Sequence, residues 1–133
     1  MILQTDITNK LYELAKGIGI TEIYPSNNTP FGEVLKERVI VSTGMNTRGS
    51  EWDNMIGVIN ICVPDIDKNG TADLIQIGKR EKTAIELFKS SHVFNLGTDW
   101  VELSLLNTSL EENTSLKCHY IHLVFSIKTL NLD

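Results

Sequence analysis

A run of acidic and amide residues has the spacing of a metal site: Asp65, Asp67, Asn69, Gly70 and Asp73. These residues match the first part of an EF-hand calcium loop, in which alternate side chains supply oxygen ligands. The match then ends, because Gln76 stands where a bidentate glutamate is required, and Pro64 ends an apolar run where the entering helix should be. We therefore predict a solvated turn, with Thr71 capping the next helix, and no calcium site.

A second candidate metal site combines a thiol with two imidazoles, at Cys118, His119 and His122. The surrounding residues alternate as in a strand, so His119 and His122 point to opposite faces, while Cys118 lies about 14 Å from His122 on one face. One ion does not reach all three groups, and we predict that they pack within a sheet. His92 has no nearby nucleophile and is predicted to interact with a helix end. The residues form no recognisable catalytic set, so we expect no enzymatic activity and no cofactor.

The 133 residues fit one domain with a single core, and the 41% hydrophobic and 22% charged fractions are ordinary for a globular chain. The net charge of -5 provides no basic surface for a phosphate backbone, which argues against sequence-specific nucleic-acid binding. No apolar run approaches the roughly 20 residues that cross a membrane, and the first residues lack a signal-peptide pattern. We expect a soluble, unsecreted protein in which Cys62 and Cys118 are buried thiols.

An apolar strand at residues 55–63, a polar turn at 64–70 and a long helix from 71 to about 91 organise the predicted fold. Both faces of the strand are mostly apolar, so we expect it to lie inside a sheet. The helix has a core-facing stripe at helical spacing, formed by Leu74, Ile77, Ala84, Leu87 and Phe88. We predict that the core joins this stripe to strand residues, namely Val58, Ile61, Ile121, Leu123 and Phe125.

An amphipathic helix opens the chain and is predicted to end at Gly17, with Gly17 or Gly19 in the left-handed conformation that stops it. Further strands are predicted at residues 20–24, 39–41, 100–106 and 116–130, with a polar loop at 107–115. The order is therefore helix, three strands, helix and two strands. This order predicts one α+β domain over residues 1–133, in which a mostly antiparallel sheet packs against one long helix with an additional N-terminal helix.

The polar segment at residues 44–54 is longer than a connection between two strands requires, and long loops often carry function. It contains Arg48, Glu51 and Trp52, which combine charged groups with an aromatic side chain of the type that dominates interfaces. We expect an assembly arm that contacts a neighbouring subunit. The alternative is a solvated hairpin tip that contacts nothing.

Four stretches follow one another around the two predicted helices: Ile23-Tyr24-Pro25, Val39-Ile40-Val41-Ser42, the run from Gly57 to Pro64 and the run from His119 to Ile127. In order, length and strand composition, nearly the whole chain resembles the tail-terminator (tail-completion) proteins of tailed bacteriophages. The resemblance implies a non-enzymatic protein that forms a ring of its own copies, a hexamer or higher, and caps the tail tube or joins tail to head. It implies tail-tube or connector proteins as neighbours, and a place in the tail or neck of a virion assembled in the host cytoplasm.

The segment at 44–54 and the acidic loop near Glu111 are longer than in the shortest members of that family, so the particular ring is left open. A neighbour is also expected to complete the edge of the long last strand. Two other interpretations are a soluble bacterial adaptor or binding domain of the same α+β class, and a small enzyme with a dispersed site.

Overall fold

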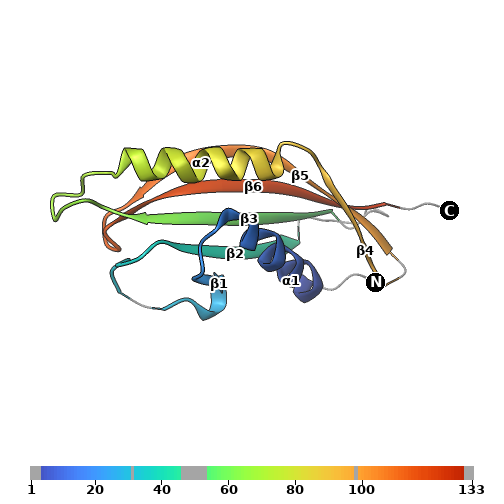
Figure 1. Ribbon diagram of the computed structural model, residues 1–133. Helices are drawn as coiled ribbons and strands as arrows, with labels where there is room; N and C mark the ends of the chain where they lie inside the picture. Colours follow the sequence, from blue (N-terminus) through green and yellow to red (C-terminus); the bar gives the residue numbers. More distant parts are fainter. Residues whose placement is uncertain (1–3, 31, 46–53, 98, 131–133) are drawn as a thin grey trace.

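The computed structural model describes residues 4–30, 32–45, 54–97 and 99–130. Its helices are α1 (Gln4–Ala15) and α2 (Leu74–Phe88), with short 3₁₀ turns η1 (Lys16–Ile18) and η2 (Ser26–Asn28). Its strands are β1 (Ile23–Pro25), β2 (Arg38–Met45), β3 (Asn54–Pro64), β4 (His92–Leu96), β5 (Asp99–Asn113) and β6 (Cys118–Leu130). They form one curled sheet in the order β1-β2-β3-β6-β5-β4 (Figure 1).

The α+β class is confirmed, but the sheet is mixed, because β1 runs parallel to β2 while the other neighbours are antiparallel. The prediction of one dominant helix is wrong. The second helix has 15 residues and the first has 12, so two helices of similar length serve the sheet. The predicted position of the apolar strand inside the sheet is confirmed, since β3 lies between β2 and β6.

The C-terminal half of the sheet differs most from the prediction. His92 begins a strand rather than ending a helix, and β5 continues through the predicted polar loop at residues 107–115 as far as Asn113. Polar residues can occupy this part of β5 because its backbone pairs with β6 from Asn107 to Asn113, while most of its side chains stay at least partly exposed. The last strand, β6, has β3 on one side and β5 on the other, so the expectation that a neighbour completes its edge is wrong.

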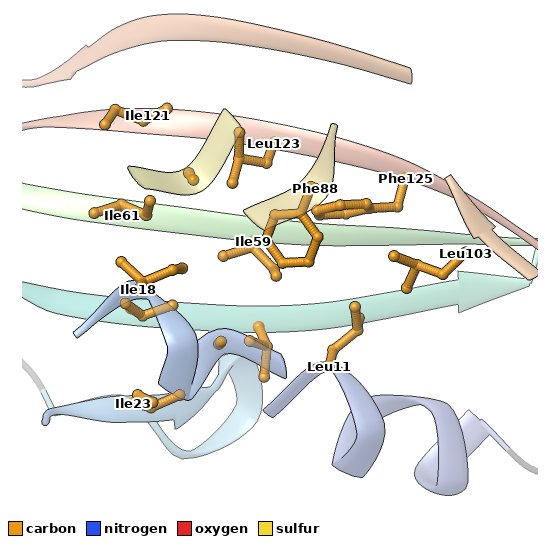
Figure 2. Packing of buried hydrophobic residues seen from close by; sticks show 14 of the residues in the cluster. Leu11, Ile18, Ile23, Ile59, Ile61, Phe88, Leu103, Ile121, Leu123 and Phe125 are labelled. Atoms are coloured by element: carbon orange, nitrogen blue, oxygen red, sulfur yellow. The ribbon is translucent and has the colours of Figure 1, made fainter. Parts of the chain in front are cut away.

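The core lies on one face of the sheet, beneath both helices (Figure 2). Alternate residues of β3 and β6 point into it, and Ile59, Ile61, Ile121, Leu123 and Phe125 are all 0% exposed. The ring of Phe88 packs edge-on against that of Phe125, with the centroids 4.8 Å apart. Two predicted core residues lie elsewhere, since Val58 is on the opposite face of β3 and Leu74 is 67% exposed. Strand alternation separates Val58 from Ile59, and Leu74 lies to one side of the buried stripe of α2.

Local chemistry accounts for the helix ends. The α-helical hydrogen bonding of α1 ends at Ala15, and the chain tightens into η1 before Gly19, not Gly17, takes the left-handed conformation at φ 91°. The prediction that Thr71 caps the second helix is also wrong. Asp73 is the cap, and its side chain accepts a hydrogen bond from the backbone N–H of Gln76 at 3.2 Å.

The second face of the sheet carries no helix in the described part of the chain. At one end it is covered by the segment before β2 and by the β5–β6 turn, where Val34 and Leu116 join the buried pair Cys62 and Cys118. The backbone N–H of Val34 donates to the carbonyl of Leu116 at 2.8 Å, which holds the two coverings together. Beyond this end, the described side chains of the second face, such as Ile56, Val58 and Val124, are only half-buried, and we call this the open face.

Candidate functional site

The predicted interface residues Arg48, Glu51 and Trp52 belong to residues 46–53, which lie outside the described residues. The flanking strands β2 and β3 are antiparallel neighbours, with Met45 paired to Met55 at the end of the ladder. The segment therefore joins the two strands of a hairpin, as the sequence predicted.

Asp65, Asp67 and Asp73, the three carboxylates with the spacing of a calcium loop, each form hydrogen bonds with a different partner. Asp67 closes the turn, because its side chain accepts hydrogen bonds from the backbone N–H of Asn69 at 2.9 Å and from the hydroxyl of Thr71 at 2.9 Å. The hydrogen bonds from Thr71 lower the pKa of Asp67 below its ordinary value. Asp73 caps α2, and Asp65 bonds to a histidine. Across residues 4–30, 32–45, 54–97 and 99–130, no three histidine, cysteine or acidic side chains converge in a way that suits a metal ion.

The histidine that bonds to Asp65 is His119, whose Nδ1 lies 2.7 Å from the carboxylate Oδ1. The side chains are 2% exposed for Asp65 and 13% for His119, so the pair is enclosed. Because a carboxylate only accepts hydrogen bonds, Nδ1 of His119 is the protonated nitrogen. The pair joins the turn after β3 to the start of β6, and its charge is satisfied within the fold.

Cys62 and Cys118 lie on neighbouring strands at diagonal positions, since Cys62 pairs with Tyr120 and Cys118 pairs with Pro64. Both are free thiols and both are buried. The hydrogen bond between the two thiols and their burial raise the pKa of Cys62 well above its ordinary value. The same hydrogen bond lowers the pKa of Cys118. Both side chains are buried and pack with Val34 and Leu116 at this end of the sheet.

The polar residues of the open face meet around His122. Its Nδ1–H donates to the side-chain oxygen of Asn60 at 2.6 Å, and the carboxylate of Glu111 lies 3.8 Å from the same nitrogen. The ring of Tyr120 stands edge-on to the imidazole, with centroids 6.3 Å apart. Burial, and then the nearby Glu111, raise the pKa of Tyr120. We call Asn60, Glu111, Tyr120 and His122 the open-face cluster, whose polar side chains contact one another on the sheet surface.

The prediction that His119 and His122 point to opposite faces is confirmed by this arrangement. His119 turns toward the helix-covered side, where Ile121 also points, and His122 turns toward the open face. The third histidine, His92, reaches back to α2 and donates from Nε2 to the carbonyl of Leu87 at 2.9 Å. It therefore satisfies a carbonyl in the last turn of the helix, as predicted, although it does so from the first position of β4.

A polar clamp that sequence reasoning missed joins α2 to the segment before β2. Arg80 donates from Nε to one carboxylate oxygen of Glu37 at 2.6 Å and from a terminal nitrogen to the other at 3.0 Å. Gln76 donates to the same carboxylate at 2.8 Å, and Arg80 also reaches the carbonyl of Ile18 at 3.2 Å. The hydrogen bond from Arg80 lowers the pKa of Glu37. No local pattern signals such a contact, because its partners are 43 residues apart.

Two shallow hollows lined by described residues lie away from the open-face cluster. One of about 430 Å³ is lined by residues of α1, β1, η2 and β2, including Gln4, Thr8 and Thr43. Another of about 420 Å³ lies beside the turn at residues 64–68 and includes Glu33, Lys68 and Lys117. Neither combines a nucleophile with a base at hydrogen-bonding distance in the described residues. No helix in these same residues is long and apolar enough to cross a membrane.

The similarity found between this chain and known proteins is one of fold and not of sequence. No protein-family model matches the chain, and no curated protein matches it in sequence. Among solved structures, the chain is similar to one from the virion of a native gene transfer agent particle, with a TM-score of 0.53 and 16% sequence identity. The similarity covers 87% of this chain and 83% of that chain. At this level of identity the likeness establishes a shared fold over most of both chains.

Proposed function

We propose that this protein is a non-enzymatic structural component of a phage-like particle. The observation that carries the proposal is the fold similarity to a chain from a gene transfer agent virion, which extends over most of both chains. The sequence resemblance to tail-terminator proteins points to the same class. The polar groups of the Asp67 turn, the Arg80–Glu37 clamp and the Asp73 cap of α2 support it too, because their hydrogen bonds are made within the fold.

Within such a particle, the protein forms a ring of its own copies, a hexamer or higher, at the tail or neck. The ring caps the tail tube or joins the tail to the head, and contacts tail-tube or connector proteins. The arm at the end of the β2–β3 hairpin, with Arg48, Glu51 and Trp52, contacts the neighbouring subunit or the next ring. Charged groups around an aromatic anchor are suited to this role.

The purified protein tests the ring directly by negative-stain imaging, together with its mass in solution. We expect closed rings of uniform size. A variant in which residues 45–50 are replaced by a two-residue turn should keep its melting temperature, because a hairpin closes over such a link, and should lose ring formation. Leu35→Ser, an exposed change far from the hairpin end, is the control and should still assemble. Rings that form equally well with the shortened arm would refute its assigned role.

A soluble adaptor or binding domain is the second candidate, and the open-face cluster favours it. Asn60, Tyr120 and His122 present polar groups on a sheet surface that carries no helix in the described residues. An adaptor stays monomeric until its partner is present, whereas a ring component associates with itself. A monomer at all concentrations, without association with purified virions, would favour the adaptor over the virion protein.

A further inference from the structure

The sheet has an unpaired stretch of edge along the second half of β5. Strand β4 pairs with β5 only from Asp99 to Leu103, although β5 continues to Asn113. In the described part of the chain, no strand lies on that side of residues 104–113. An edge of this length presents a row of main-chain donors and acceptors, and such an edge is a template for pairing with another strand.

The other edges of the sheet are less able to accept a strand. At the opposite side, β1 has three residues and ends in Pro25, which has no N–H to donate. The part of β2 beyond β1 is covered by α1, since the amide of Gln4 donates to the carbonyl of Thr43 at 2.6 Å. The outer edge of β4 has five residues. A pairing between two copies would therefore use the long edge of β5 on both sides, which requires an antiparallel, two-fold contact.

We propose that this edge binds the same edge of a second copy of the chain, centred on Leu110. The register places Leu110 opposite its own copy, Ser109 opposite Glu111, Thr108 opposite Glu112, and Asn107 opposite Asn113. Hydroxyl groups thus face carboxylates, amides face amides, and no like charges are opposed. Pairs of this kind stabilise an antiparallel ladder, whereas opposed like charges destabilise it.

Neighbouring registers are less favourable. In β5, the N–H and C=O groups of every second residue point away from β6. A second copy can therefore pair only in registers that place these residues of the two copies opposite each other. A shift of the centre by one residue toward the C-terminus places Glu111 opposite Glu111 of the copy, so two like charges oppose each other. A shift the other way opposes Glu112 to Leu106, at the bulge between Leu105 and Asn107, where the ladder is irregular.

The apolar side chains beside this edge are consistent with an added strand. Leu110 pairs with the buried Ile121 and therefore points to the helix-covered side, yet it is 45% exposed. Leu74 and Ile85, exposed by 67% and 42%, share one flank of α2. Arg80 lies on the other flank, where it binds Glu37 just before β2, so Leu74 and Ile85 face the β5 side of the sheet. A second copy at the β5 edge extends the sheet below them and covers Leu110.

Sedimentation equilibrium of the full chain between about 1 and 100 µM measures this contact. We expect a two-fold association step, between single copies or between rings, whose dissociation constant rises at least about tenfold in Leu110→Glu, because carboxylates then oppose each other on the two-fold axis. Leu35→Glu, the same change at a leucine that is 80% exposed and lies outside the proposed edge at residues 104–113, should leave the constant unchanged. A chain that is monomeric at 100 µM, or whose association ignores Leu110→Glu, overturns the proposal.

Cysteine cross-linking tests the register even if Leu110→Glu fails to fold. Leu110→Cys should form a covalent dimer rapidly under mild oxidation, since the two positions are opposite each other. Ser109→Cys is the matched control, because residue 109 faces residue 111 of the copy and should cross-link slowly. Peptide mapping separates these links from any at Cys62 or Cys118. Equal rates for the two variants would overturn the two-fold register. This contact is distinct from the arm that holds the proposed ring, so Leu110→Glu should remove the two-fold association and leave ring formation unchanged.

Discussion

The helix-covered face and the open face of β3 carry side chains of similar type in different surroundings. Ile59 and Ile61 are 0% exposed on the covered face, whereas Ile56 and Val58 are only half-buried on the open face. Apolar composition alone therefore did not decide which face became the core. The covered face is the one on which α1 and α2 place their apolar stripes, while the open face holds the polar cluster around His122. A sheet buries the face that the helices can reach, and the other is available for contacts.

Phe88→Ala should produce the largest loss of stability. Phe88 is 2% exposed and packs on Phe125 at the centre of the covered face, so removing its ring leaves a cavity. We expect the free energy of unfolding, measured by urea denaturation, to fall by about 3–5 kcal/mol. A fall below about 1 kcal/mol would mean that the covered face is not the main core.

Two glycine-to-alanine substitutions compare the closely packed Gly57 of β3, beneath α1, with Gly44 of the neighbouring strand β2. A Cβ at Gly57 would lie 2.9 Å from the side chain of Ile127 and 3.0 Å from that of Leu11, so these side chains must move. We expect a loss of about 1–3 kcal/mol. Gly44→Ala in β2 is the control, since no atom of the described residues lies within 4 Å of the new atom. Its unfolding free energy should change by less than about 0.5 kcal/mol, or rise slightly.

A pair of identical substitutions compares the two faces directly. Val41 is 0% exposed on the covered face of β2, and Val58 is half-buried on the open face of β3. Val41→Ala should cost about 1.5–2.5 kcal/mol, because it removes buried apolar surface and leaves a small cavity. Val58→Ala should cost less than about 1 kcal/mol in the monomer. Equal losses would show that a partner already covers the open face in solution.

Glu37→Gln should have a smaller effect than the substitutions in the core, and its effect should depend on pH. The hydrogen bond from Arg80 lowers the pKa of Glu37 in the folded state, so the ionised form stabilises the fold. This contribution is complete above the unfolded pKa of about 4.3 and is lost as the pH falls through the lower folded pKa. We expect Glu37→Gln to cost about 0.5–1.5 kcal/mol at pH 7, because both side chains of the pair are about a fifth exposed.

Denaturation of both proteins from pH 7 to pH 3 checks this prediction. The difference in unfolding free energy between the parent and Glu37→Gln should shrink below about pH 4. A difference that is constant with pH would show that the carboxylate acts through packing and hydrogen bonding rather than through its charge.

Predictions from local patterns were correct where the determining signal is also local. The alternation of residues 55–63 and 119–127 predicted strands that the structure confirms, and helical spacing predicted that Ile77, Ala84 and Phe88 share the buried face of α2. The opposed directions of His119 and His122 followed from strand geometry in the same way. Backbone periodicity governs each of these features, so it can be seen in a few consecutive residues.

Predictions failed where a distant partner decides the outcome. The polar residues after Asn107 form a strand because β6 supplies hydrogen bonds to their backbone, and β4 forms because β5 lies beside it. The clamp between Arg80 and Glu37 is likewise invisible in the local sequence, since it depends on where α2 crosses the sheet.

By itself, the sequence determined the α+β class, the apolar strands and the two amphipathic helices, because hydrophobic periodicity is a property of neighbouring residues. Tertiary structure alone decided that Val58 lies outside the core and that β6 is central. It also decided that no described strand pairs with the outer edge of β5 at residues 104–113. The physical reason is that strand pairing and helix placement are long-range choices. Each strand offers two faces and two edges, and only the rest of the chain determines which of them are covered.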